Sequence, residues 1–205
     1  MTRVVVAIVL AAGESTRMGR SKALLDDPDG RPFAARLVRT FAEAGVPDVI
    51  VVTGRDHAAV AEALAADRLP VLPALVNNPD PSRGQLSSLL VGLDAAATRG
   101  ADGILVTLVD IPMVRASTIR AVVDAWRSRR APIVRPAMGD RHGHPVLFDR
   151  AVFEELRDAP LAEGAKTVLR ARAAAVVNVP VDDEGCLTDV DTPDDYDAMR
   201  RGRLR

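Results

Sequence analysis

The chain has 205 residues, 48% of them hydrophobic and 27% charged, which is typical of a globular protein with a substantial buried core. Its 27 basic and 28 acidic side chains leave a net charge of −1, so no overall basic field would attract nucleic acid or an anionic membrane surface. No segment reaches the roughly 20 apolar residues of a membrane helix. The single cysteine, Cys186, excludes an intrachain disulfide and a cysteine-based zinc site, and it favours a reducing cytoplasm.

The predicted strands begin with the apolar run Val4–Leu10. Its basic start and the small residues after it imitate a signal peptide, but its β-branched composition favours a strand buried on both faces. Six further runs are predicted as strands: Val49–Thr53, Val71–Val76, Ile104–Val109, Ile133–Arg135, Pro145–Phe148 and Ala175–Val179. The stretch "APIVRPAMGDRHGHPVLF" indicates two short strands around a turn, which predicts an antiparallel or mixed edge of the sheet.

Helical patterns lie between many of these strands. Three apolar faces have helical spacing: Leu37, Val38 and Phe41; Leu86, Leu89, Leu90 and Leu93; and Ile119, Val122, Val123 and Trp126. Gly45 and Gly100 are expected to end the first two helices, and Ser117 is expected to cap the third. The alternation predicts one α/β domain over residues 1–205 with a mainly parallel sheet. Ligands bind beyond the carboxyl ends of such strands, which directs attention to the loop after Leu10.

That loop lies within "VLAAGESTRMGRSKALL" and has the spacing of neither a Walker A motif nor a GxGxxG motif. Gly13 would let the backbone approach a phosphate, and the N–H groups from Gly13 to Ser15 would form an anion-binding turn. Arg17 and Lys22 would add charge-assisted contacts. A solvated basic loop is the alternative. Because the chain has only two lysines, each of them is more informative than usual.

Carboxylates follow two of the apolar segments. Asp110 comes directly after a predicted strand, where it could bind Mg²⁺ or cap the following turn; the residues alone favour neither. Asp189 and Asp191 alternate along an extended stretch, so their side chains point the same way. A helix is then expected to begin with Thr192 as its N-cap, and Asp195 in its first turn is expected to have a structural role only.

The stretch "LAAGESTRMGRSK" resembles the signature loop of the MobA-like NTP transferases, a family that includes enzymes transferring nucleotides onto molybdopterin. Four later stretches resemble segments of the same family, in the same order: "NNPDPSRGQLSSLLVGL", "LVDIPMV", "GHPVLF" and "DVDTPDDY". The resemblance spans the whole chain and is greatest to molybdenum cofactor cytidylyltransferases. It implies a three-layer, Rossmann-like (GT-A-like) α/β fold with a mainly parallel mixed sheet.

The resemblance also implies roles for individual residues. The nucleoside triphosphate would be bound by Leu10, Ala11, Ala12, Gly13, Arg17, Lys22, Asn78, Gly84, Gln85 and Ser87. Catalysis would depend on Arg17, Lys22 and Asp110. The Mg²⁺ cofactor would be bound by Asp110 and Asp191. His144 would lie on the side of the acceptor.

Several other polar residues are expected outside the site or in doubt. Asp189 remains an alternative to Asp191 as the second metal ligand. Arg20 and His57 are expected to be solvated, and Lys166 is expected on a surface helix. The pair of histidines around Gly143 is too small a set for a metal site by itself.

The implied reaction is the Mg²⁺-dependent transfer of a nucleoside monophosphate to the phosphate of molybdopterin, with release of pyrophosphate. Ala12 favours CTP over GTP, because guanylyl-transferring relatives have glycine there and a methyl group narrows the base pocket. A molybdoenzyme or its chaperone is the candidate protein partner. The alternatives are a nucleotidyltransferase acting on a sugar phosphate or another small phosphate, and a non-catalytic protein of the same fold that binds or delivers a cofactor. A Rossmann dehydrogenase is disfavoured by the missing GxGxxG.

Overall fold

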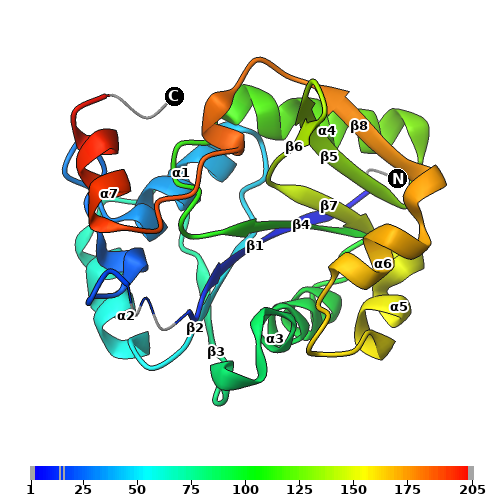
Figure 1. Ribbon diagram of the computed structural model, residues 1–205. Coiled ribbons are helices and arrows are strands. Elements are labelled where there is room, and N and C mark those ends of the chain that lie inside the picture. The colour runs from blue at the N-terminus through cyan, green and yellow to red at the C-terminus, as the bar shows by residue number, and fades with distance from the viewer. Residues whose placement is uncertain (1–2, 14, 16, 203–205) are drawn as a thin grey trace.

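The strands form one mixed sheet in the computed structural model, which describes residues 3–13, 15 and 17–202 (Figure 1). They are β1 (Val5–Ala11), β2 (Val49–Thr53), β3 (Ala74–Asn77), β4 (Gly103–Leu108), β5 (Ile133–Met138), β6 (Arg141–His142), β7 (Val146–Asp149) and β8 (Val176–Pro180). Their order is β3-β2-β1-β4-β7-β5-β6, with β8 paired to β5. The first four strands are parallel, whereas β7 is antiparallel to β4 and β5, and β6 is antiparallel to β5. The predicted mixed edge is therefore confirmed.

Helices cover both faces of this sheet and give the molecule three layers (Figure 1). They are α1 (Phe33–Glu43), α2 (His57–Ala66), α3 (Gln85–Thr98), α4 (Ala116–Arg129), α5 (Phe153–Asp158), α6 (Lys166–Ala171) and α7 (Pro193–Arg200). Helices α1, α2, α4 and α7 pack on one face, and α3, α5 and α6 on the other. Short 3-10 turns span Lys22–Leu24, Pro81–Arg83, Arg150–Val152, Ala173–Ala175 and Glu184–Cys186. No helix in the described part of the chain is long and apolar enough to span a bilayer.

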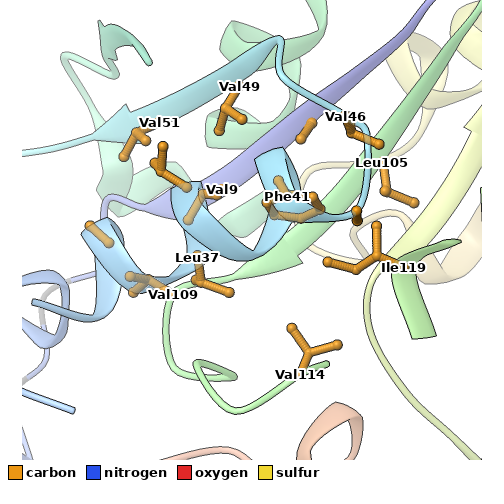
Figure 2. Packing of buried hydrophobic residues seen from close by; sticks show 14 of the residues in the cluster. Val9, Leu37, Phe41, Val46, Val49, Val51, Leu105, Val109, Val114 and Ile119 are labelled. Atoms are coloured by element: carbon orange, nitrogen blue, oxygen red, sulfur yellow. The ribbon is translucent and has the colours of Figure 1, made fainter. Parts of the chain in front are cut away.

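Alternate residues of β1 contribute to two separate cores. Val9 belongs to the core under α1 and α4, where Figure 2 shows it with Leu37, Phe41 and Leu105, whereas Ile8 belongs to the core under α3. These five side chains are completely buried, and burial of each stabilises the fold by about 1.5–3 kcal/mol. Because β1 is held from both sides, the place of its carboxyl end in the sheet is fixed by packing on both faces.

Two local expectations are wrong. The third strand begins at Ala74 and not at Val71, since Pro73 has no backbone N–H to offer a neighbouring strand. Helix α4 begins at Ala116, and Ser117 lies inside it instead of capping it. The cap comes from a distant segment, because the buried Asp183 carboxylate accepts hydrogen bonds from the Arg115 N–H (2.9 Å) and the Thr118 hydroxyl (2.6 Å).

Candidate active site

A cavity of about 260 Å³ lies at the carboxyl ends of β1 and β4. Among the predicted site residues, it brings together Leu10, Ala11, Ala12, Gly13, Arg17, Lys22, Gln85, Asp110 and Asp191. These residues come from parts of the chain up to 181 positions apart. The parallel strands β1 and β4 place the first loop beside Asp110, while the start of α3 adds Gln85 and the segment before α7 adds Asp191. Glu14, in the expected anion-binding turn, lies outside the described residues.

A cluster of four charged side chains occupies one wall of this cavity. The Lys22 ammonium donates to Oδ2 of Asp110 (2.8 Å) and to Oδ1 of Asp191 (2.5 Å). Arg17 donates from Nη2 to the other oxygen of Asp191, Oδ2, at 2.7 Å. Lys22 and Asp110 are largely covered, with side-chain exposures of 11% and 18%, whereas Arg17 is 65% exposed. Two carboxylates therefore converge on one inner cation, and a second cation reaches the cluster from the solvent side.

The cluster changes the proton affinities of its members. Burial lowers the pKa of Lys22, but the hydrogen bonds to Asp110 and Asp191 raise it by more, so that it lies above its ordinary value of 10.5. The hydrogen bond from Lys22, opposed by burial and assisted by Arg17, holds the pKa of Asp191 below its ordinary value of 3.8. At neutral pH, Lys22 is therefore an ammonium and Asp191 a carboxylate.

Backbone contacts hold the two carboxylate segments together. The Val190 N–H donates to the Asp110 carbonyl at 2.7 Å, although the two residues are far apart in the chain. The predicted N-cap at Thr192 is confirmed, and it forms a capping box in which Asp195 accepts from the Thr192 N–H at 2.8 Å. Asp195 also accepts from the Asp191 N–H (3.2 Å), so the cap of α7 fixes the backbone that carries Asp191.

The carboxylate pair suits Mg²⁺. Oδ1 of Asp110 is buried and has no hydrogen-bond partner, which is costly for a carboxylate oxygen unless a cation or ligand completes it. Within the described residues, no group of three or more His, Cys, Asp or Glu side chains could hold a metal. Two carboxylates are nevertheless sufficient for Mg²⁺, which typically completes its shell with water and substrate phosphates. Asp189 is exposed and does not line the cavity, which favours Asp191 as the partner of Asp110.

Three predicted nucleotide-binding residues lie outside the lining of this cavity. The Asn78 amide is buried and donates from Nδ2 to the hydroxyls of Ser87 and Ser88, both at 2.9 Å. Ser87 in turn donates to the Gly84 carbonyl at 2.7 Å. The polar groups of Asn78 and Ser87 thus hold the start of α3 in position. Gln85, which was also predicted to bind the nucleotide, lines the cavity together with Ser88.

Ala12 forms part of the cavity wall, and its position depends on a glycine that the sequence analysis missed. Gly54 follows β2 and lies so close that a Cβ there would be 2.9 Å from the Ala12 carbonyl oxygen and 3.3 Å from its Cα. Ser15 was expected to offer only its backbone N–H, and the role of its side chain was missed. Its Oγ accepts from the Lys22 N–H at 3.1 Å and so orients the backbone that carries the lysine. The only sign of these contacts in the sequence is that Gly54 and Ser15 each follow a predicted strand.

A larger groove, of about 1080 Å³, adjoins the cavity and shares Leu10, Gln85 and Leu108 with it. Its inner wall is apolar, with Phe148 and Val146 of β7 among the side chains that form it. Its lining also contains the cationic side chains of Arg83, Arg135, Lys166 and Arg170. The groove therefore combines an apolar wall with four cations and one carboxylate, Glu163, and it adjoins the cavity that holds the charged cluster.

His144, expected on the acceptor side, lines this groove. Its Nδ1 lies 3.3 Å from the Val106 carbonyl oxygen, which can only accept, so Nδ1 bears the proton and Nε2 is left as an acceptor. Burial lowers the pKa of His144, which keeps the imidazole neutral at pH 7. His144 can thus accept a hydrogen bond from a bound molecule without adding a charge.

Three residues expected outside the site have more specific surroundings than the sequence indicated. Lys166 is exposed at the start of α6 but does line the groove. His57 is half-buried and shares a 2.6 Å hydrogen bond with Thr53 through Nδ1. Arg20 stacks over the Tyr196 ring at 5.4 Å, which joins the loop after β1 to α7. The surroundings of Lys166 and Arg20 depend on distant parts of the chain, which local patterns do not reveal.

Comparison with known proteins identifies the family. A family model described as the MobA-like NTP transferase domain matches residues 7–176. The chain belongs to the MobA-like NTP transferase family. It is accordingly a nucleotidyltransferase, and the expected fold class is confirmed by solved nucleotidyltransferase structures with the same architecture, including one from Methanothermobacter at a TM-score of 0.77.

Two relatives of this MobA-like chain match it over nearly its full length. Purine catabolism protein PucB of Bacillus subtilis is 29% identical over 200 residues, which cover 96% of each chain. The crystal structure of Rv0371c from Mycobacterium tuberculosis is 33% identical, with a TM-score of 0.77, and the match covers 98% of this chain and all of that one. A bifunctional protein GlmU of Rhizobium etli is 37% identical over 173 residues, but the match spans only 37% of that longer protein.

Proposed function

We propose that this protein transfers CMP from CTP to the phosphate of molybdopterin and releases pyrophosphate. The observation that carries the proposal is the cluster of Lys22, Asp110 and Asp191 beside the Ala11–Gly13 backbone. A purely nucleotide-binding protein has no need for a converging carboxylate pair with an unpartnered buried oxygen. The cluster therefore favours catalysis over the alternative of a non-catalytic cofactor-binding or delivery protein.

In the proposed reaction, an oxygen of the acceptor phosphate forms a bond to the α-phosphorus of the nucleoside triphosphate. The bond from that phosphorus to the bridging oxygen breaks, and its electron pair leaves with pyrophosphate. No general base is required, because a phosphate monoester is already ionised near pH 7. Catalysis then consists of positioning and charge neutralisation.

The residues of the cavity have distinct roles in this proposal. Arg17 and Lys22 would stabilise the charge that builds on the departing pyrophosphate, Arg17 as a fork and Lys22 as a point charge. Asp110 and Asp191 would hold the metal. When bound there, Mg²⁺ would neutralise phosphate charge and orient the triphosphate. Use of a divalent metal is supported by a solved relative, the Rv0371c complex with manganese, at 30% identity and a TM-score of 0.73.

The nucleotide preference rests on Ala12. Ala12 lines the cavity, and Gly54 packs closely against its backbone. We expect the methyl group of Ala12, where guanylyl-transferring relatives have glycine, to narrow the space for a base. A pyrimidine fits such a pocket better than a purine. We therefore expect CTP to bind more tightly than GTP.

The acceptor would lie in the groove that adjoins the cavity. Four cations in its lining favour an anionic compound, and its apolar wall suits a broad, flat body more than the hydroxyl groups of a sugar phosphate. Arg135 is the best placed of the four. Asn178 accepts from its Nε at 2.9 Å, which fixes the guanidinium and leaves its two Nη groups for an anion.

Pyrophosphate release tests the proposal directly. The purified protein with Mg²⁺ would be given CTP or GTP, each with molybdopterin, a sugar phosphate, or no acceptor. We expect release with CTP and molybdopterin, and Arg135→Met should raise the KM for the acceptor without changing the affinity for CTP. Equal release with sugar phosphates would favour the alternative acceptor class. Tighter binding of GTP than CTP would overturn the nucleotide preference, and absence of release with every pair would favour a non-catalytic protein.

A further inference from the structure

We propose that Lys22 is an internal counter-cation that competes with the divalent metal for Asp110 and Asp191 and is released to the triphosphate when metal and nucleotide enter together. Lys22 would thereby weaken the binding of free metal and strengthen the binding of the metal–nucleotide complex. The nucleotide half of this inference rests on the proposed function, whereas the competition for the carboxylates does not.

The competition follows from the geometry of the cluster. The Lys22 ammonium lies within hydrogen-bond distance of one oxygen of each carboxylate, at 2.8 and 2.5 Å. A metal bound by both carboxylates could use the unpartnered Oδ1 of Asp110, but both oxygens of Asp191 already accept, Oδ1 from Lys22 and Oδ2 from Arg17. It would also need the space between the carboxylates that the ammonium fills, since Mg²⁺ lies about 2.0–2.1 Å from its ligands. Ammonium and metal therefore cannot both occupy the point where the carboxylates converge.

The charges predict the sign of the effect. Two carboxylates face one lysine and one arginine, so the cluster of Asp110, Asp191, Lys22 and Arg17 has no net charge. A free dication must displace a largely buried ammonium that then has no anion to pair with, which is unfavourable. When the dication arrives with a triphosphate, the phosphate oxygens provide the displaced ammonium with a new partner. Metal and nucleotide should consequently bind cooperatively.

The residue type at position 22 suits such an exchange. The chain has 27 basic side chains of which only two are lysines, at 22 and 166. An arginine would bind a carboxylate through a planar fork, whereas an ammonium on a flexible stem can rotate from one group of oxygens to another. A lysine in a chain so rich in arginine agrees with a cation that must change partners.

Binding of Mn²⁺, followed by the electron paramagnetic resonance of the free ion, tests the inference without any turnover. In the absence of nucleotide, Lys22→Met should bind Mn²⁺ at least tenfold more tightly than the wild type. Lys166→Met, which removes the other lysine, should leave the affinity for Mn²⁺ unchanged. The double variant Lys22→Met with Asp110→Asn should lose the gain, which assigns it to this site. With a non-hydrolysable CTP analogue, the order should reverse, and Lys22→Met should bind the metal–nucleotide complex at least tenfold more weakly.

Several results would overturn the inference. Lys22→Met binding free Mn²⁺ no more tightly than the wild type would show that the lysine does not obstruct the metal. If Lys22→Met does not fold, as judged by circular dichroism, Lys22→Gln must show the same gain. The wild type provides a further test. If the CTP analogue does not change its affinity for Mn²⁺, Lys22 does not move from the carboxylates to the triphosphate. The comparison of Mn²⁺ affinities without nucleotide remains valid if CTP is the wrong nucleotide. Failure of the proposed function can therefore be distinguished from failure of this inference.

Discussion

Gly54→Ala should damage both the fold and the nucleotide site, because the new methyl group would press on the backbone of Ala12. A Cβ at position 54 would be 2.9 Å from the Ala12 carbonyl oxygen, whereas ordinary contacts begin at 3.4 Å, so the two segments must separate by about 0.5 Å. Neither can yield easily, since Thr53 pairs with Ala11 in the sheet and the His57 N–H donates to the Gly54 carbonyl at 3.1 Å.

Overpacking of this kind costs about 1–3 kcal/mol, and each kcal/mol lowers the melting temperature of a domain of this size by about 2–4 °C. If about 1.4 kcal/mol of the strain falls on the cavity wall, the Kd for a CTP analogue rises tenfold. Thermal unfolding and isothermal titration calorimetry measure the two effects. Gly13→Ala is the matched control for stability, because a Cβ there would meet nothing within 4 Å and the backbone is not left-handed. Wild-type stability and affinity in Gly54→Ala would refute the reasoning.

The remaining predictions concern the charged cluster. Asp110→Ala and Lys22→Ala should each lower turnover at least about a hundredfold without unfolding the protein, since loss of one charge-stabilising contact typically costs ~2.7–4 kcal/mol of barrier. Pyrophosphate release measures turnover, and Asp189→Asn is the control. Near-normal turnover in either variant would contradict the assigned roles. Asp195→Ala should lower the free energy of unfolding in urea by about 0.5–2 kcal/mol through loss of the α7 cap, and Asp194→Ala should lower it less. Asp195→Ala should also weaken Mn²⁺ binding in the presence of nucleotide. An unchanged affinity for Mn²⁺ would mean that the cap does not position Asp191. Because the pKa of Asp191 is held below 3.8, its ionised form stabilises the fold above that pH, and this contribution is lost as pH falls through the folded-state pKa. Urea midpoints should therefore fall less steeply with acid below about pH 4 in Asp191→Asn than in the wild type, and parallel curves would argue against the ion pair.

Features that depend on local sequence could be predicted, and features that depend on distant contacts could not. The run of β-branched residues around Val9 fixes a buried strand, and the position of Asp110 after another such strand brings it to the ligand edge of the sheet. Thr192 was predicted as a cap because the residues with which it bonds follow it directly. The roles of these residues stay predictions, but their location in the fold needed little beyond periodicity and strand ends.

The errors arose where a polar group finds its partner far along the chain. Ser117 is a good capping residue, but Asp183 supplies the cap of α4 from 65 residues beyond Thr118. Asn78 remains a predicted nucleotide ligand, and only the fold shows that its amide group donates to Ser87 and Ser88. The close approach of Gly54 to Ala12 is likewise a product of strand packing. Sequence patterns name candidate polar groups, whereas the fold decides which of them remain free for a ligand.

The hydrogen bond from the Val190 N–H to the Asp110 carbonyl joins a segment that is made late to one that is made early. All of the strands, the loop with Lys22, and Asp110 leave the ribosome before Asp191 does. A nascent chain that ends at β8 contains every strand of the sheet, but it has only one of the two converging carboxylates. The proposed metal-binding pair is therefore complete only once the segment after β8 has been made, so that a chain ending at β8 lacks a complete charged cluster.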